Sequence, residues 1–100
     1  MAELSGKVAI ITGAAKGFGL AASKAFVEEG AKVVMTDVDE NEGQKQADAL
    51  GDKAIFIKQD VSKEESWPEV FKKAEDTFGP VTVLVNNAGI LLFDNAEEVK

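Results

Sequence analysis

Short apolar runs alternate with amphipathic stretches along the chain. Four runs have the length and the β-branched content of buried strands, namely Val8–Thr12, Ala31–Asp37, Ala54–Val61 and Val81–Val85. Between them lie stretches with helical spacing, one opening near Gly17 and ending before Gly30, one over Asp39–Leu50, and one ending at Gly79-Pro80. Strands that alternate with helices predict βαβ units around a parallel sheet.

The third helix has two candidate starts. Ser62-Lys63-Glu64-Glu65 and Ser66-Trp67-Pro68-Glu69 both have the Ser-x-x-Glu form of a capping box. A start at Ser62 leaves Pro68 unable to donate to the carbonyl of Glu64, whereas a start at Ser66 avoids this conflict. We favour Ser62. The buried stripe of this helix is predicted at Val70, Phe71, Ala74 and Phe78.

A glycine-rich turn joins the first strand to the first helix. Gly13, Gly17 and Gly19 allow a tight bend and a close approach of the backbone to a ligand, because they carry no Cβ atom. The first amides of the helix and its dipole favour an anion, so the turn is a candidate phosphate site. On glycine spacing alone, a turn that binds nothing is an equal alternative.

Composition narrows the function classes. The chain has 100 residues with 45% hydrophobic content, enough for one compact unit but hardly for two domains. Its net charge of -7 argues against nucleic acid or an anionic membrane as a partner. It contains no cysteine and no histidine, which disfavours thiol nucleophiles and metal enzymes. It lacks a secretion signal and a membrane-length apolar run, so we expect a cytoplasmic protein.

Polar or glycine-containing groups close all four predicted strands. They are Thr12-Gly13, Asp37, Asp60-Val61 and Asn86-Asn87-Ala88-Gly89. The carboxyl ends of parallel strands meet at one edge, where such sheets bind ligands. Asp37 lies 18 residues past Gly19, close to the separation at which a carboxylate binds an adenosine ribose and repels a 2′-phosphate. A solvated loop aspartate is the alternative.

These motifs together resemble the short-chain dehydrogenases/reductases, from Gly6 to about Phe93. The cofactor turn of that family, Thr-Gly-x-x-x-Gly-x-Gly, matches Thr12 to Gly19, and its Asn-Asn-Ala-Gly stretch matches Asn86 to Gly89. Its Asp-Val pair after the third strand matches Asp60-Val61. The expected fold class is therefore α/β: a partial, doubly wound, Rossmann-like parallel sheet of about four strands in the order 3-2-1-4. Residues 1–100 would form a single, incomplete NAD-binding domain.

The resemblance also implies a cofactor site. The turn would face the pyrophosphate, Asp37 would bind the adenosine ribose, Asp60 and Val61 would border the adenine, and the Asn-Asn-Ala-Gly stretch would line the middle of the cofactor. Lys16 can help a 2′-phosphate in NADP-using relatives, but we expect repulsion by Asp37 to favour NAD over NADP. The predicted cofactor-binding residues are Gly13, Lys16, Gly17, Phe18, Gly19, Asp37, Asp60, Val61, Asn87, Ala88 and Gly89.

The main departure from the family is the catalytic tyrosine. Family members carry a Tyr-x-x-x-Lys pair that supplies general acid/base catalysis, and this chain has no tyrosine. We therefore predict no catalytic residue in these 100 residues, which alone would be inactive. An alcohol or carbonyl substrate would bind only if the rest of the domain were supplied. The alternative is an interaction or structural module that no longer uses the cofactor.

Such a partial domain would also leave apolar surface exposed. With strand order 3-2-1-4, Val81–Val85 would form a sheet edge, and the apolar segment Ile90–Phe93 would have no partner. We therefore expect marginal stability and self-association through the fourth strand.

Overall fold

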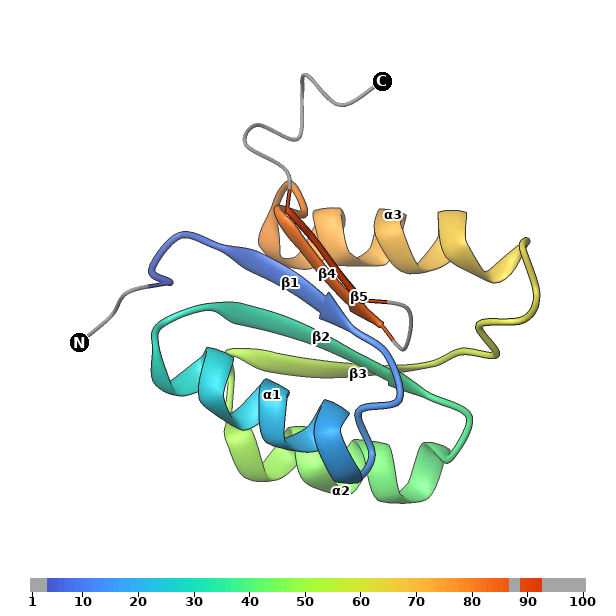
Figure 1. Ribbon diagram of the computed structural model, residues 1–100, viewed down its shortest axis with the longest axis horizontal. Helices are drawn as coiled ribbons and strands as arrows, with labels where there is room; N and C mark the ends of the chain where they lie inside the picture. The colour runs from blue at the N-terminus through green and yellow to red at the C-terminus, as the bar shows by residue number, and fades with distance from the viewer. Residues whose placement is uncertain (1–3, 87–88, 93–100) are drawn as a thin grey trace.

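The computed structural model describes residues 4–86 and 89–92, which form five strands and three helices (Figure 1). In chain order the elements are β1 (Val8–Ile11), α1 (Gly17–Glu28), β2 (Lys32–Asp37), α2 (Glu40–Leu50), β3 (Ala54–Lys58), α3 (Ser66–Phe78), β4 (Val83–Asn86) and β5 (Gly89–Leu92). The expected alternation of strands and helices is confirmed. β1, β2 and β4 are each one residue shorter than the predicted run, and β3 ends at Lys58 instead of Val61.

The sheet has the order β3-β2-β1-β4-β5. β1 pairs in parallel with β2 on one side and with β4 on the other, and β2 pairs in parallel with β3. The parallel part therefore has the predicted order 3-2-1-4, and the fold is α/β and Rossmann-like. The order reverses between β1 and β4, the place where open α/β sheets bind ligands.

Helices cover both faces of the sheet, with α1 and α2 on one side and α3 on the other (Figure 1). Alternate residues of β1 supply the two cores: Ala9 and Ile11 pack on the side of α1 and α2, whereas Val8 and Ile10 pack on the side of α3. This alternation explains why the strand reads as a continuous apolar run without a polar face.

Packing between α2 and β3 depends on Gly43. A Cβ atom at this position would overlap the aromatic ring of Phe56. The glycine therefore lets the polar helix α2 approach the end strand of the sheet closely.

The predicted start of α3 at Ser62 is wrong, because the helix begins at Ser66. Pro68 then lies in the first turn, where its missing N–H would have had no helical partner. The hydroxyl and amide of Ser62 instead donate to Asp60 Oδ1, at 2.6 and 3.0 Å. Neither serine acts as a helix cap, since the N-cap residue is Glu65 and makes no side-chain capping bond.

The predicted edge position of the fourth strand is also wrong. β5 pairs antiparallel with β4, from Val83 opposite Leu92 to Asn86 opposite Gly89. Most of the apolar segment that was expected to lack a partner therefore forms a strand, and the edge next to β4 belongs to β5. Phe93 lies outside the described residues. Among the described residues, no helix has the length and apolar character needed to cross a bilayer.

Candidate cofactor-binding site

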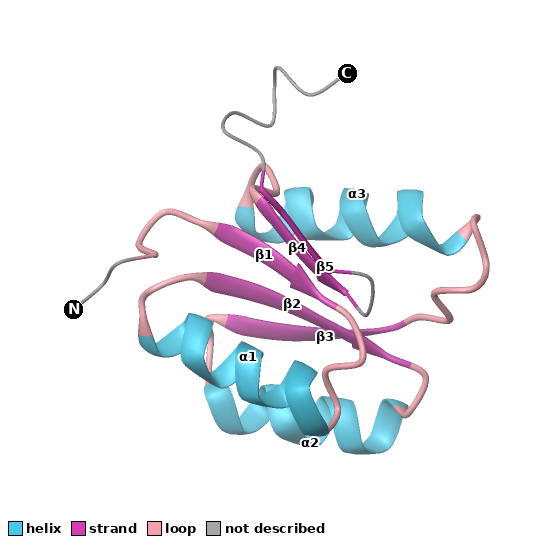
Figure 2. Cartoon of the chain, in the orientation of Figure 1, coloured by secondary structure: helices cyan, strands magenta, loops and turns pink. Residues whose placement is uncertain are grey.

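The loops that follow β1, β2 and β3 gather at the carboxyl edge of the parallel sheet (Figure 2). They carry the glycine-rich turn, Asp37 and the Asp60-Val61 pair, respectively. Parallel pairing alone brings these chain segments to one edge, as the sequence predicted.

The glycine-rich turn, residues 12–19, is bonded to strands on both sides of β1. Thr12 donates its amide to the carbonyl of Val85 at 3.0 Å, and Ala14 donates to the carbonyl of Thr36 at 2.9 Å. Two glycines of this turn have left-handed backbone conformations, Gly13 with φ of 60° and Gly17 with φ of 63°. A side chain would be strained at either position, so the turn depends on glycine there.

Gly19 has a different role. A Cβ atom on Gly19 would lie 2.8 Å from the carbonyl oxygen of Thr12 and 2.7 Å from the carbonyl carbon of Gly13. The third glycine therefore lets the first turn of α1 lie directly against the end of β1.

The amino end of α1 has no internal anionic cap. Its N-cap residue, Lys16, makes no side-chain capping bond, and the first turn contains no acidic residue. In α2, by contrast, the Asp39 side chain accepts from the amide of Glu42, and two glutamates occupy the first turn. The first amides of α2 thus have an acidic cap and acidic neighbours within the chain, whereas the first amides of α1 have neither. A bound anion at the start of α1 would accept hydrogen bonds from these amides.

Asp37, the last residue of β2, lies against the glycine-rich turn. Its Oδ2 accepts a hydrogen bond from the amide of Ala15 at 3.0 Å, and its Oδ1 accepts from the amide of Asp39 at 3.0 Å. Each carboxylate oxygen can accept a further bond. The side chain is therefore held in place and still has acceptor capacity for a ligand.

The loop after β3 holds a second carboxylate. Hydrogen bonds from the hydroxyl and amide of Ser62, together with the charge of Lys63, lower the pKa of Asp60 below its ordinary value. Asp60 is therefore an ionised acceptor at neutral pH. Its Oδ1 accepts both bonds from Ser62, while no residue of the described chain bonds to Oδ2.

Hydrogen bonds of Gln59, Ser66 and Trp67 hold the loop after β3 in place. The hydroxyl of Ser66 donates to the carbonyls of Lys63 and Asp60, at 2.7 and 3.2 Å, and accepts a bond from the side-chain amide of Gln59 at 3.1 Å. The indole of Trp67 donates to the carbonyl of Val61 at 3.4 Å. None of these residues was predicted from the sequence to belong to the site, because Ser66 and Trp67 bond to the loop backbone and Gln59 bonds to Ser66.

The large apolar side chains that are exposed in the described chain follow the strand ends. They are Phe18 in the glycine-rich turn, Val38 after β2 and Val61 after β3, with exposed fractions of 72%, 61% and 45%. All three lie at the carboxyl edge of the parallel sheet, where the described residues of the predicted site also lie. Val38 was not among the residues predicted from the sequence to form the site.

Two predicted residues, Asn87 and Ala88, lie outside the described residues. Gly89 opens β5 and pairs with Asn86 at the end of β4. Gly13, Lys16, Gly17, Phe18 and Gly19 share one turn, which the Ala15 amide links to Asp37. Asp60 and Val61 follow the next strand of the sheet.

The strand order and the glycine-rich turn define a Rossmann-like dinucleotide-binding fold. Comparison with known protein families identifies the family within this fold: residues 7–100 match the model of the short chain dehydrogenase family. The chain belongs to this family.

Similar proteins are oxidoreductases. The chain is 47% identical over 98 residues to an NADP-dependent (R)-specific alcohol dehydrogenase of Lentilactobacillus kefiri, covering 96% of this chain and 39% of that protein. It is 47% identical over 90 residues to a 3-beta-hydroxysteroid dehydrogenase of Comamonas testosteroni, covering 90% and 35%. The chain thus spans less than two fifths of the length of these curated relatives.

A solved structure has the same fold. The 3-ketoacyl-(acyl-carrier-protein) reductase of Brucella melitensis, crystallised with NADH, superposes with a TM-score of 0.79 and is 41% identical. The match covers 82% of this chain and 34% of the reductase.

Proposed function

We propose that this chain is the NAD(H)-binding part of an oxidoreductase that transfers hydride between a nicotinamide cofactor and an alcohol or carbonyl substrate. The observation that carries the proposal is the hydrogen bond from the Ala15 amide to Asp37 Oδ2. It joins a candidate diphosphate site and a candidate ribose acceptor into one unit.

The amino end of α1 would hold the diphosphate. The amides of Gly17, Phe18 and Gly19 open this helix, and no side chain caps them. Backbone amides and the helix dipole favour a phosphate at such a position, by about 0.3–1 kcal/mol from the dipole alone. Gly13 and Gly17 have open space where a Cβ would be, so the phosphate could approach the backbone closely.

Asp37 would select the cofactor. Its carboxylate could accept hydrogen bonds from the hydroxyls of the adenosine ribose, and it would repel the 2′-phosphate of NADP. Lys16 is exposed and next to Ala15, so it opposes this selection, and one relative is described as NADP-dependent. We propose that Asp37 prevails, because two backbone amides fix its carboxylate whereas the lysine head group is solvated.

The loop after β3 would hold the adenine. Asp60 Oδ2 is an acceptor suited to an exocyclic amino group, and Val61 and Val38 offer apolar surface beside it. Asn87, Ala88 and Gly89 are proposed to line the middle of the cofactor, whose nicotinamide supplies or accepts the hydride when bound. The chain has no tyrosine, histidine or cysteine, so we assign it cofactor binding and no proton-transfer role.

Titration calorimetry of the purified protein with NAD and with NADP tests this function. We expect both dinucleotides to bind at one site, with NAD at least about tenfold tighter, since a charge repulsion of about 1.4 kcal/mol corresponds to that ratio. Equal or tighter binding of NADP would refute the cofactor assignment. No heat and no thermal shift with millimolar NAD would favour a module that does not use the cofactor.

A further inference from the structure

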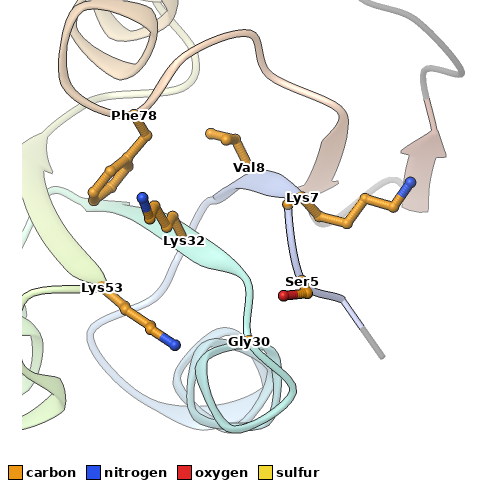
Figure 3. A pocket seen from close by; sticks show the side chains of 8 residues that line it. Ser5, Lys7, Val8, Gly30, Lys32, Lys53 and Phe78 are labelled. Carbon is orange, nitrogen blue, oxygen red and sulfur yellow. The ribbon is translucent and has the colours of Figure 1, made fainter. Parts of the chain in front are cut away.

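A pocket lies at the end of the sheet opposite the candidate cofactor site, where the parallel strands begin (Figure 3). Its volume is about 300 Å³, and its walls come from the turn before β1, the starts of β2 and β3, and the end of α3. Three lysines line it: Lys7, Lys32 and Lys53. Lys32 opens β2 whereas Asp37 closes it, so the two sites are about 17 Å apart at about 3.3 Å per residue.

The backbone fixes these lysines side by side. The amide of Lys32 donates to the carbonyl of Lys7 at 3.0 Å, and the amide of Val33 donates to the carbonyl of Lys53 at 2.8 Å. The three residues therefore start neighbouring strands of the order β1, β2 and β3. Lys32 is opposite Val8 in the sheet and not opposite Lys7, but positive charges at one end of a sheet still repel one another unless something compensates them.

Neighbouring carboxylates do not supply this compensation. The protein has a net charge of -7, yet within the described chain none of the three lysines forms an ion pair, and the observed ion pair joins Lys72 to Asp76 on α3. A local positive cluster on an acidic protein is therefore a place where an anion is favoured against the overall charge.

Two of the three lysines border the pocket from different sides. In Figure 3, the side chain of Lys32 turns toward Phe78 and that of Lys53 extends toward Gly30, with the hydroxyl of Ser5 across from them, whereas Lys7 extends away from both. The ammonium of Lys32 lies 5.8 Å from the ring centroid of Phe78, a cation–π contact that holds its side chain over the pocket wall. Phe78 and the buried Val8 give this wall an apolar part.

We propose that this pocket binds a small phosphate compound, either inorganic phosphate or a compact phosphate ester. Lys32 and Lys53 would supply the charge, Ser5 would donate a hydrogen bond, and the side of Phe78 would contact an apolar group of an ester. A volume of about 300 Å³ is at the lower limit of small-molecule sites, which suits a ligand of this size and excludes a whole dinucleotide.

The test is a ¹H–¹⁵N NMR titration of the protein at constant ionic strength. Inorganic phosphate and phenyl phosphate are added in separate titrations. Phosphate can also bind at the glycine-rich turn, so amide signals of the two sites are followed separately. We expect signals of Gly6, Gly30 and Lys32 to shift and to saturate below about 10 mM ligand, before and after saturation with NAD. Tighter binding of phenyl phosphate would identify an ester as the ligand, and equal or weaker binding would identify the free ion.

The variant Lys32→Ala/Lys53→Ala should weaken binding at this pocket at least about tenfold, while the signals of Gly13 and Gly17 respond to NAD as before. The matched control is Lys72→Ala/Lys73→Ala on the exposed side of α3, which removes the same charge and should leave the affinity within about twofold. Absence of saturable shifts, or an equal loss in both double variants, would overturn the proposal. A failure of NAD binding alone would refute the proposed function and leave this result unaffected.

Discussion

The amide of Ala15 donates a hydrogen bond to the Asp37 carboxylate at 3.0 Å, across 22 residues of sequence. The acceptor closes β2, and the donor lies in the turn between β1 and α1. The adjacent amide of Ala14 bonds to the carbonyl of Thr36, so the turn is attached to β2 at two successive residues. The position of the carboxylate is therefore set by the same contacts that shape the glycine-rich turn.

Replacing Asp37 should affect cofactor choice and stability together. In Asp37→Ala, loss of hydrogen bonds from the ribose to a charged acceptor should weaken NAD binding by roughly tenfold or more, while NADP binding changes less. The amides of Ala15 and Asp39 also lose their acceptor, which should cost about 1–2 kcal/mol of unfolding free energy. Calorimetric titration and urea unfolding measure the two effects.

The matched control for this variant is Asp52→Ala, which removes the same charge from an exposed loop residue. It should leave the NAD to NADP ratio unchanged. If both variants narrow the ratio equally, net charge and not the position of Asp37 determines cofactor preference.

The glycines of the turn should differ in their tolerance of alanine. Gly19→Ala places a methyl group against the carbonyl of Thr12, so α1 must move, at a cost of about 3 kcal/mol and with loss of NAD binding. Gly17→Ala meets open space and should cost only the backbone strain of about 1–2 kcal/mol. Urea unfolding of both variants measures this order, and a larger loss in Gly17→Ala would contradict the packing role of Gly19.

The hydroxyl of Ser66 should matter for the adenine half of the cofactor. Ser66→Ala removes three hydrogen bonds that fix the loop of Asp60 and Val61, and we expect a stability loss of about 1–2 kcal/mol with weaker AMP binding. Binding of nicotinamide mononucleotide should not change. The control Thr77→Ala removes an exposed hydroxyl from the same helix, and a similar AMP effect there would exclude a specific role of Ser66.

The lowered pKa of Asp60 predicts how the stability of the protein changes with pH. Its pKa in the folded protein lies below the ordinary value of 3.8, so the unfolded chain binds more protons in the window between the two values. The stabilisation from this group is fully present above that window and is lost as the pH falls through the folded pKa. Ser62→Ala should raise the pKa of Asp60 in a ¹³C-detected NMR titration, and an unchanged midpoint would contradict the role of the Ser62 hydroxyl.

The parallel sheet could be predicted because its strands are locally distinct. The run from Val8 to Ile11 is apolar on both faces, and no other local structure of that length buries both sides. Helix starts were harder to predict, since Ser62 and Ser66 have the same local pattern. The bonds from Ser62 to Asp60, and the backbone bond from the Lys63 amide to the Asp60 carbonyl, make this position a turn and not a helix cap.

Features formed by distant segments could not be predicted from local pattern. β5 pairs antiparallel with β4, and the apolar run Ile90–Leu92 does not by itself specify this partner. Spacing identified Asp37 as a ribose acceptor, but not its bond to Ala15. The pocket lined by Lys7, Lys32 and Lys53 is formed where three strands begin. In the sequence, each of these lysines has the pattern of an ordinary exposed charge.

The most direct test of the account is a ¹H–¹⁵N NMR titration of the isotope-labelled protein with NAD. We predict that the largest amide shifts fall in the glycine-rich turn, at Gly13, Gly17 and Gly19, and at Val38 after Asp37, while Lys32 and Lys53 at the opposite end of the sheet do not respond. Saturable shifts confined to other residues, with the turn unaffected, would contradict the claim that this turn and Asp37 together hold the cofactor.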